Sequence, residues 1–238
     1  MMGKPILFIY LALFPFGNLL KISILNASDV LAALGLIYFV FSEKKIKSLF
    51  DPFKDFILIA LFSFVFSIFI FKNLNLLVGG LYLLRIVIYF YFFKFSLLTL
   101  RKNPKLKNIV FDSLIIVSFF TAVFGWIQYF IFPDLTFLKY LGWDDHLYRL
   151  AGTFLDPSFT GLIIVFGAIL SLLRKKYLFL AFFLISLAFT YSRAGYVALT
   201  ASFIFAGFLT KKFKAVAISF VYFLVIILLL PRPAGQGV

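Results

Sequence analysis

Two arginines stand at the edges of strongly apolar runs, and each lies close to a residue that can start a helix. Asp156-Pro157 follows Arg149: an Asp side chain accepts hydrogen bonds from the free N–H groups of a helix start, and Pro fits the first helical position. Ser192 directly precedes Arg193 and could cap a second helix in the same way. Guanidinium groups and helix N-termini both bind anions, and phosphate accepts two parallel hydrogen bonds from a guanidinium. If both helices start on one side of a membrane, these residues predict a phosphate site there. The alternative is that both arginines touch lipid phosphates without specificity.

Arg85 is a third cation in an unusual place. It lies about 9 residues into an apolar run, which is roughly 14 Å along a helix. A charge at that depth costs at least about 2.5 kcal/mol and normally faces a protein interior or a wet cavity. We expect it to bind phosphate or to hold Asp156; the alternatives are a structural pair with Gln128, or snorkelling to the membrane surface.

His146 is the one histidine of the chain and follows Asp144 and Asp145. An imidazole in this setting could act as a general base while a carboxylate orients the ring. The alternative is an interfacial loop residue without a chemical role, so the catalytic group is left open. No metal site is expected, because one histidine and two adjacent carboxylates lack a diagnostic spacing.

The composition is that of a polytopic membrane protein. Of 238 residues, 64% are hydrophobic and 13% charged, which is far too apolar for a soluble domain. The net charge of +14 would indicate nucleic-acid binding in a soluble protein. Here the basic residues cluster in short turns between apolar runs, so we expect contacts with membrane lipids and no nucleic acid. The absence of cysteine excludes disulfides and thiolate metal sites.

The order of apolar runs predicts an all-α transmembrane helical bundle of about nine spans over residues 1–230. The expected spans are 5–20, 29–42, 52–71, 76–100, 104–132, 157–173, 177–191, 194–210 and 213–230. Pro15 and Gly17 predict a kink or short break in the first of them. Residues 133–152 form an expected external loop, and residues 231–238 the start of a further external loop.

Basic residues recur in alternate turns and so predict the orientation. The basic turns are Lys44–Lys47, Arg101–Lys107, Arg174–Lys176 and Lys211–Lys214, and Lys4 falls on the same side. The positive-inside rule then places the N-terminus in the cytoplasm and the C-terminus outside the inner (plasma) membrane. The helices that begin after Asp156 and Ser192 would both start at the outer face, together with the 133–152 loop.

Taken in chain order, Arg149, Gly152-Thr153-Phe154, Asp156-Pro157 and Ser192-Arg193-Ala194-Gly195 resemble the O-antigen ligase and O-antigen polymerase family of membrane glycosyltransferases. The resemblance is strongest over residues 125–210. It implies the C-type glycosyltransferase membrane fold and transfer of a glycan from a polyprenyl-diphosphate carrier to a lipid or glycan acceptor on the outer face of the inner membrane, without a metal or other cofactor. We expect the diphosphate to bind Arg149, Arg193 and Arg85, with Gly152, Thr153, Asp156 and Ser192 as supporting residues.

The sequence departs from the family at its C-terminus. The family's general base is expected to be a histidine in a large external loop after the ninth span, and His146 is not at that position. We therefore expect a C-terminally truncated or shortened member that lacks the catalytic loop.

Two other functions compete with this interpretation. A multi-span transporter or flippase for an anionic lipid-linked solute would also use outer arginines, but it should show broken helices at matching places in two halves. The break at Pro15 and Gly17 has no clear partner. A purely structural subunit would leave Arg85 unexplained.

Overall fold

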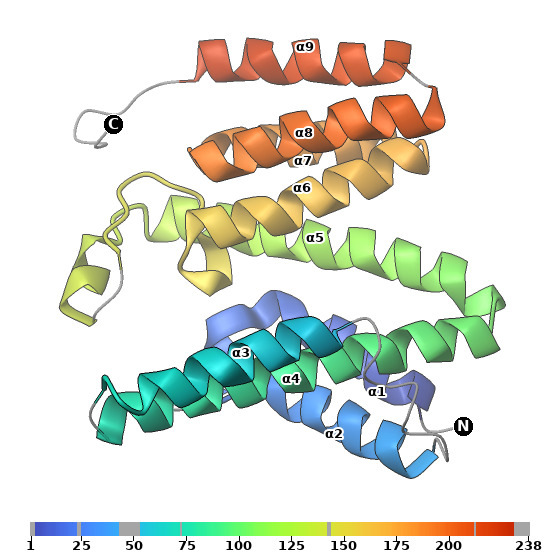
Figure 1. Cartoon of the computed structure of the whole chain (residues 1–238). Helices are drawn as coiled ribbons and strands as arrows, with labels where there is room; N and C mark the ends of the chain where they lie inside the picture. The colour runs from blue at the N-terminus through green and yellow to red at the C-terminus, as the bar shows by residue number, and fades with distance from the viewer. Residues whose placement is uncertain are drawn as a thin grey trace. The chain divides into compact units, whose positions relative to one another are not determined.

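The computed structural model describes residues 3–22, 25–42, 53–71, 73–141, 144–211 and 213–230, and it is helical almost throughout (Figure 1). One short antiparallel pair, Lys21–Ile22 (β1) with Leu25–Asn26 (β2), interrupts the helices near the start of the chain. The all-α prediction is therefore confirmed. The basic turn around residues 43–52 and the terminal residues 231–238 lie outside the described residues.

Among the described residues, three helices are long and apolar enough to cross a membrane, namely Leu76–Lys102, Lys105–Ile131 and Arg193–Thr210. This supports a membrane protein. The other apolar helices have 10–17 residues each and are shorter than a typical span. The structure thus supports three spans by length and composition, where the sequence predicted about nine.

The chain divides into two compact units, and each is described by itself. Unit 1 comprises Met1–Leu13 and Lys21–Lys107, whereas unit 2 comprises Phe14–Leu20 and Asn108–Val238. The short segment Phe14–Leu20 therefore belongs to unit 2, although the residues on both sides of it belong to unit 1.

In its described residues, unit 1 contains four α-helices: α1 (Gly3–Leu13), α2 (Ala27–Ser42), α3 (Lys54–Ser67) and α4 (Asn73–Lys102). Helix α2 packs closely along α4, because a Cβ built on Gly35 would lie only 2.5 Å from Cδ2 of Phe92. The rings of Tyr38 and Phe95 meet 5.9 Å apart, further along both helices in the same sense. The two helices therefore run in the same direction.

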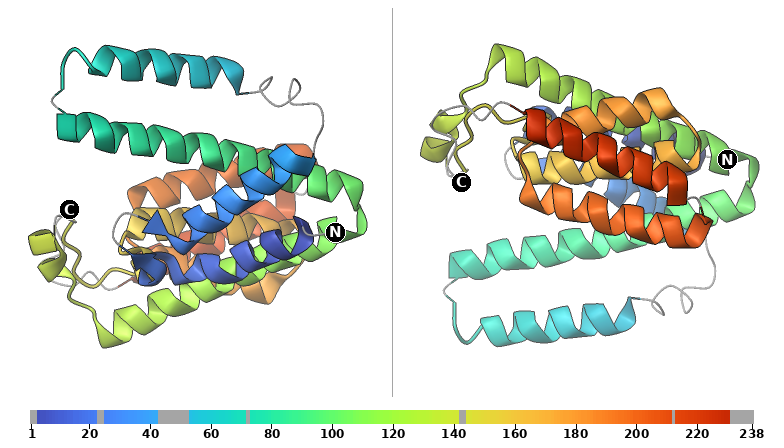
Figure 2. Two further views of the ribbon diagram at one scale, coloured as in Figure 1. Left: turned by 90° about the horizontal axis from the view of Figure 1, so that it is seen from below. Right: turned by 90° about the horizontal axis from the view of Figure 1, so that it is seen from above.

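Helices α3 and α4 form an antiparallel hairpin, which Figure 2 shows as two helices side by side. The rings of Phe53 and Phe90 stack with their centres 4.3 Å apart near one end of the hairpin. Near its other end, a Cβ on Gly80 would lie 3.2 Å from Cζ of Phe64. Most side chains of α3 are exposed, and most of these exposed side chains are apolar, which suits a lipid environment.

Unit 2 is built around α5 (Lys105–Ile131), α6 (Pro157–Leu173), α7 (Tyr177–Phe189), α8 (Arg193–Thr210) and α9 (Phe213–Leu229). Helix α6 packs against α7 and α8, and α9 covers the far side of α7 and α8 (Figure 1). Their apolar side chains form one core. Its buried members are Ile115, Ala122, Leu150, Ile164, Val165, Ala168, Leu170, Leu172, Leu180, Phe183, Leu184, Leu187, Ala188, Leu199, Phe203 and Phe223.

Helix α5 is fixed to this core by close and polar contacts. A Cβ on Gly167 of α6 would lie 2.4 Å from Cβ of Ser118, so glycine is required there. The Ser118 hydroxyl donates to the carbonyl of Ile163 at 3.1 Å, and Nε1 of Trp126 donates to Ser186 at 2.9 Å.

The two ends of unit 2 differ in their charged groups. Near one end, Asp112 of α5 accepts from Nζ of Lys176 at 2.8 Å and lies 3.1 Å from Nε of Arg174. These groups are partly exposed to solvent, so the ion pairs add little stability. The loop that carries Arg149 lies at the opposite end, because Leu150 packs on Gly125 near the other terminus of α5.

Most predicted boundaries agree with the helices to within a few residues. Helix α6 begins and ends as predicted, while α7 ends at Phe189, two residues early. The break expected at Pro15 and Gly17 is confirmed: α1 gives way to a 3-10 helix, η1 (Phe14–Leu20), and Gly17 has φ 49° and ψ −125°. Where the structure describes it, the loop after α5 contains two short 3-10 helices, η3 (Thr136–Leu141) and η4 (Gly152–Phe154).

Candidate functional site

The turn from Arg149 to Asp156 is rigidly built. The amide oxygen of Gln128 accepts from the N–H groups of Ala151 at 2.9 Å and of Gly152 at 3.1 Å. Leu150 is fully buried, and its N–H donates to the carbonyl of Phe189 at 3.0 Å. On sequence grounds, Gln128 is a candidate partner of Arg85. Its amide oxygen instead accepts hydrogen bonds from the backbone of this turn. The segment is an ordered support rather than a loose loop.

Glycine is needed at two places in this turn. A Cβ on Gly125 would lie 2.1 Å from Cδ2 of Leu150, so only glycine lets the turn approach α5. Gly152 has φ 63°, a conformation that costs other residues about 1 kcal/mol or more. The Thr160 hydroxyl donates to the carbonyl of Ala151 and ties the turn to the first turns of α6.

Both predicted helix caps are confirmed. The Asp156 carboxylate accepts from the N–H of Ser158 at 2.7 Å and of Phe159 at 3.3 Å, and Pro157 is the first residue of α6. Ser192 accepts from the N–H of Gly195 at 3.1 Å and caps α8. Each cap satisfies N–H groups that a helix start otherwise leaves without a partner.

The starts of α6 and α8 are in contact. A Cβ on Gly161, in the second turn of α6, would lie 3.6 Å from Cβ of Ser192 and 3.5 Å from the hydroxyl of Thr190. Because α7 returns the chain between them, α6 and α8 point the same way (Figure 1). The two positive ends of the helix dipoles therefore lie together.

Arg149 lies at this same place. Its Nη2 donates to the carbonyl of Tyr191 at 2.7 Å, one residue before the cap of α8. The residue is half-buried, whereas Arg193 is exposed at the first position of α8. Within the part of the chain that the structure describes, neither arginine has a carboxylate partner. The local positive charge is therefore not neutralised by an ion pair.

His146 is buried, with 8% of its surface exposed, and it is held by its backbone. Its carbonyl accepts from the N–H of Leu135 at 2.8 Å, next to a β-bridge between Asp134 and Leu147. Among the described residues, its Nδ1 atom is enclosed and has no hydrogen-bond partner.

Burial of His146, and then the positive charge of Arg149, lower the pKa of its imidazole below the usual value near 6.5. The carboxylates of Asp156, Asp144 and Asp145 oppose this shift. This lowered pKa favours the neutral ring, the state that a proton acceptor requires.

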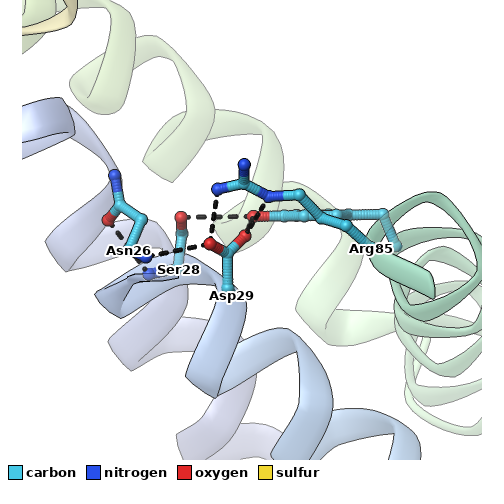
Figure 3. Close-up of polar contacts among 5 residues, drawn as sticks. Asn26, Ser28, Asp29 and Arg85 are labelled. Carbon is cyan, nitrogen blue, oxygen red and sulfur yellow. Dashed lines mark hydrogen bonds and ion pairs between the residues drawn. The ribbon is translucent and has the colours of Figure 1, made fainter. Parts of the chain in front are cut away.

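Arg85 of unit 1 has a partner that sequence reasoning missed (Figure 3). Its Nε donates to Oδ1 of Asp29 at 2.7 Å, and its Nη2 donates to the other carboxylate oxygen. Tyr89 donates to the same carboxylate at 2.8 Å, and the N–H of Asn26 does so at 2.9 Å. The side chain of Asp29 is 9% exposed and that of Arg85 36%.

The sequence did contain a signal for this pair. Asp29 is an acidic residue in the first turn of an otherwise apolar helix, and such a residue needs a partner in a membrane. Only the packing of α2 along α4 shows that the cation paired with Asp29 is Arg85.

Within the described ranges, no group of three or more His, Asp or Glu side chains is placed to hold a metal ion. No protein-family model, curated protein or solved structure gives a significant match to this chain. The family resemblance therefore rests on the residues themselves.

Proposed function

We propose that this chain is a membrane glycosyltransferase of the O-antigen ligase and polymerase type, and that unit 2 binds the diphosphate of a polyprenyl-linked glycan. The observation that carries the proposal is the position of Arg149, whose guanidinium is held at the start of α8 without a carboxylate partner in the described residues. Arg193 adds a second cation at the same helix start. Together they supply hydrogen bonds and charge for a phosphate.

The chemistry of the helix starts favours one of them as the position of the anion. Asp156 puts a negative carboxylate on the N–H groups of α6, so that end repels a second anion. The cap of α8 is the neutral hydroxyl of Ser192, which leaves the positive end of that dipole uncompensated. We therefore locate the diphosphate at the start of α8, beside Arg149.

In the proposed reaction, a hydroxyl oxygen of the acceptor attacks the anomeric carbon of the donor glycan, and the proton of that hydroxyl passes to solvent water. The bond from that carbon to the diphosphate oxygen breaks, and its electron pair leaves with the diphosphate. Arg149 and Arg193 stabilise the negative charge that accumulates on the leaving group. This stabilisation lowers the barrier only if it is stronger in the transition state than in the bound donor.

The proposed orientation puts this site on the outer face of the inner membrane, with the N-terminus in the cytoplasm and about nine membrane-crossing segments. Two features of unit 2 support it. The basic turn Arg174–Lys176 pairs with Asp112 at one end, and Arg149 with the capped starts of α6 and α8 lies at the other. Short helices such as α7 would span with their flanking turns at the lipid headgroups.

The test is binding of a radiolabelled polyprenyl diphosphate to the purified protein, followed by a measurement of glycan transfer in membranes that contain it. We expect Arg149→Ala and Arg193→Ala each to weaken binding at least tenfold and the double variant to abolish transfer, because a charged hydrogen bond contributes about 1.5–3 kcal/mol. Arg149→Lys should also bind poorly, because an ammonium cannot donate two parallel bonds.

Lys139→Ala is the matched control, since Lys139 is an exposed cation of the same loop region. Its binding should equal that of the unchanged chain. Normal donor binding by the double arginine variant would refute the proposal. Movement of intact donor across vesicle membranes without transfer would favour the transporter or flippase instead.

A further inference from the structure

The segment Phe14–Leu20 contacts the Arg149–Asp156 turn, and it also contacts α5, because the rings of Phe16 and Phe124 meet with their centres 5.3 Å apart. Its sequence, FPFGNLL, forms the 3-10 helix η1, and it packs on η4 within unit 2. Helix η4 occupies Gly152–Phe154, between Arg149 and the Asp156 cap. This makes η1 the N-terminal element in direct contact with the turn that carries the proposed site.

Two side-chain hydrogen bonds join these elements. The Thr153 hydroxyl donates to the carbonyl of Pro15 at 2.7 Å, in a buried position. Nδ2 of Asn18 donates to the carbonyl of Phe154 at 2.8 Å. The rings of Phe14 and Phe154 also meet, with their centres 5.5 Å apart. Each bond joins a side chain of one element to the backbone of the other.

Gly17 lies between these two bonds and leaves no space for a side chain. A Cβ there would lie 2.8 Å from Oγ1 and 2.9 Å from the carbonyl oxygen of Thr153. One of those atoms belongs to the backbone of η4, so a larger residue would displace the turn itself. Gly17 also has φ 49°, which L-residues rarely adopt.

The turn needs support from more than one side. Gly152 has φ 63° and Leu155 has φ 58°, so its backbone twice adopts a left-handed conformation. Such conformations persist only where the surroundings enforce them. Gln128 of α5 supplies one support through Ala151 and Gly152, and η1 supplies the other through Thr153 and Phe154.

We propose that η1 positions the donor site, with Gly17 and Asn18 as positioning residues that set the place of Arg149 relative to the capped starts of α6 and α8. This rests on the proposed function of that site. Neither residue touches the donor. Displacing η1 shifts η4, and a shift of about 1 Å at a binding turn can cost up to a hundredfold.

Saturation binding of radiolabelled polyprenyl diphosphate separates positioning from simple destabilisation. A variant that merely unfolds more easily has fewer binding sites with an unchanged Kd, whereas a positioning residue changes the Kd of the folded molecules. For Gly17→Ala and Asn18→Leu we expect the Kd to rise on the order of tenfold. Gly79→Ala is the matched control, because a Cβ there meets its nearest neighbour, Phe64, at an ordinary 3.8 Å.

An unchanged Kd in both η1 variants, alongside a raised Kd in Arg149→Ala, would overturn the positioning role and leave the site intact. If Arg149→Ala also binds normally, the site itself is refuted and the positioning role with it.

A second measurement does not depend on the donor. The chain has no cysteine, so Asn18→Cys/Phe154→Cys introduces the only two thiols. A short thiol-reactive cross-linker should join them within one chain, and each single-cysteine variant should remain unjoined. Failure of the double variant to cross-link would overturn the proposed contact.

Discussion

Arg85 in unit 1 and Arg149 in unit 2 are both arginines among apolar helices, but their charges are balanced differently. Arg85 meets the carboxylate of Asp29 through two hydrogen bonds. Arg149 meets only the neutral carbonyl of Tyr191 among the described residues. A carboxylate therefore balances the charge of Arg85, whereas no carboxylate of the described residues pairs with Arg149. The depth of an arginine in an apolar run therefore does not identify an anion site. What matters is whether a carboxylate already pairs with that arginine.

This contrast changes the set of arginines in the proposed site. A phosphate that bound Arg85 would have to displace Asp29, whose side chain is 9% exposed, and leave that carboxylate buried without its cation. Such a displacement costs several kcal/mol. We therefore assign Arg85 to the packing of α2 against α4, and the proposed diphosphate site contains Arg149 and Arg193.

The largest expected effect is the loss of folding stability when the Asp29–Arg85 ion pair is broken. Asp29→Asn should lower the free energy of unfolding by roughly 1.5–3 kcal/mol, because the partly exposed guanidinium of Arg85 loses its charged hydrogen-bond partner. The double variant Asp29→Asn/Arg85→Met should lose less than the sum of the single losses, since neither charge remains. Thermal unfolding in detergent measures all three variants.

Donor binding is the control for this comparison of the single and double variants. The Kd for a polyprenyl diphosphate should be unchanged in the double variant. Additive losses of stability would show that Asp29 and Arg85 do not stabilise each other, and weaker donor binding would show that Arg85 contributes to the donor site.

A smaller effect is expected from a charge at the start of α8. Ser192→Asp keeps a capping oxygen but puts a carboxylate where the diphosphate is proposed to bind. Donor affinity should fall roughly tenfold relative to Ser192→Asn, which has the same size and no charge. Equal donor affinities of these two variants would show that the diphosphate does not bind at the start of α8.

The smallest expected effect is a change in the titration of His146. It is the one histidine of the chain, so NMR of ¹³C-labelled histidine reports it alone when the purification tag contains none. Its pKa should lie below 6.5, should rise in Arg149→Gln, which removes a like charge, and should fall further in Asp156→Asn, which removes an opposite one.

The same titration has a consequence for stability. Because the folded state holds this pKa below its unfolded value, the unfolded chain binds the proton first as the pH falls. Stability that is present above pH 6.5 is therefore lost below it. If the pKa of His146 is the same in Arg149→Gln as in the unchanged chain, the two side chains are not close to each other.

The sequence predicted the features of this fold that depend on neighbouring residues. The caps at Asp156 and Ser192 and the break at Gly17 follow from local backbone chemistry, and all three are confirmed. The partners of Arg85 and Gln128 could not be predicted. They depend on which helix faces pack together, and nearly uniform apolar helices such as α3 and α4 give little information about their faces.

The support of η4 by η1 could not be predicted for the same reason. It joins residues 138 positions apart in the chain, Pro15 and Thr153, and neither residue type by itself indicates the other. The membrane assignment, by contrast, needs only composition, and three helices in the described ranges have the length and hydropathy that it requires.

The pairing of Asp29 with Arg85 also bears on how the chain is made. Asp29 precedes Arg85 by 56 residues, so its carboxylate is synthesised first and is present when the segment that forms α4 emerges. A guanidinium near the middle of α4 would oppose the partition of that segment into lipid, and an acidic partner already in place removes this opposition. Insertion of α4 should therefore depend on α2 having arrived before it, so that the order of synthesis contributes to correct assembly.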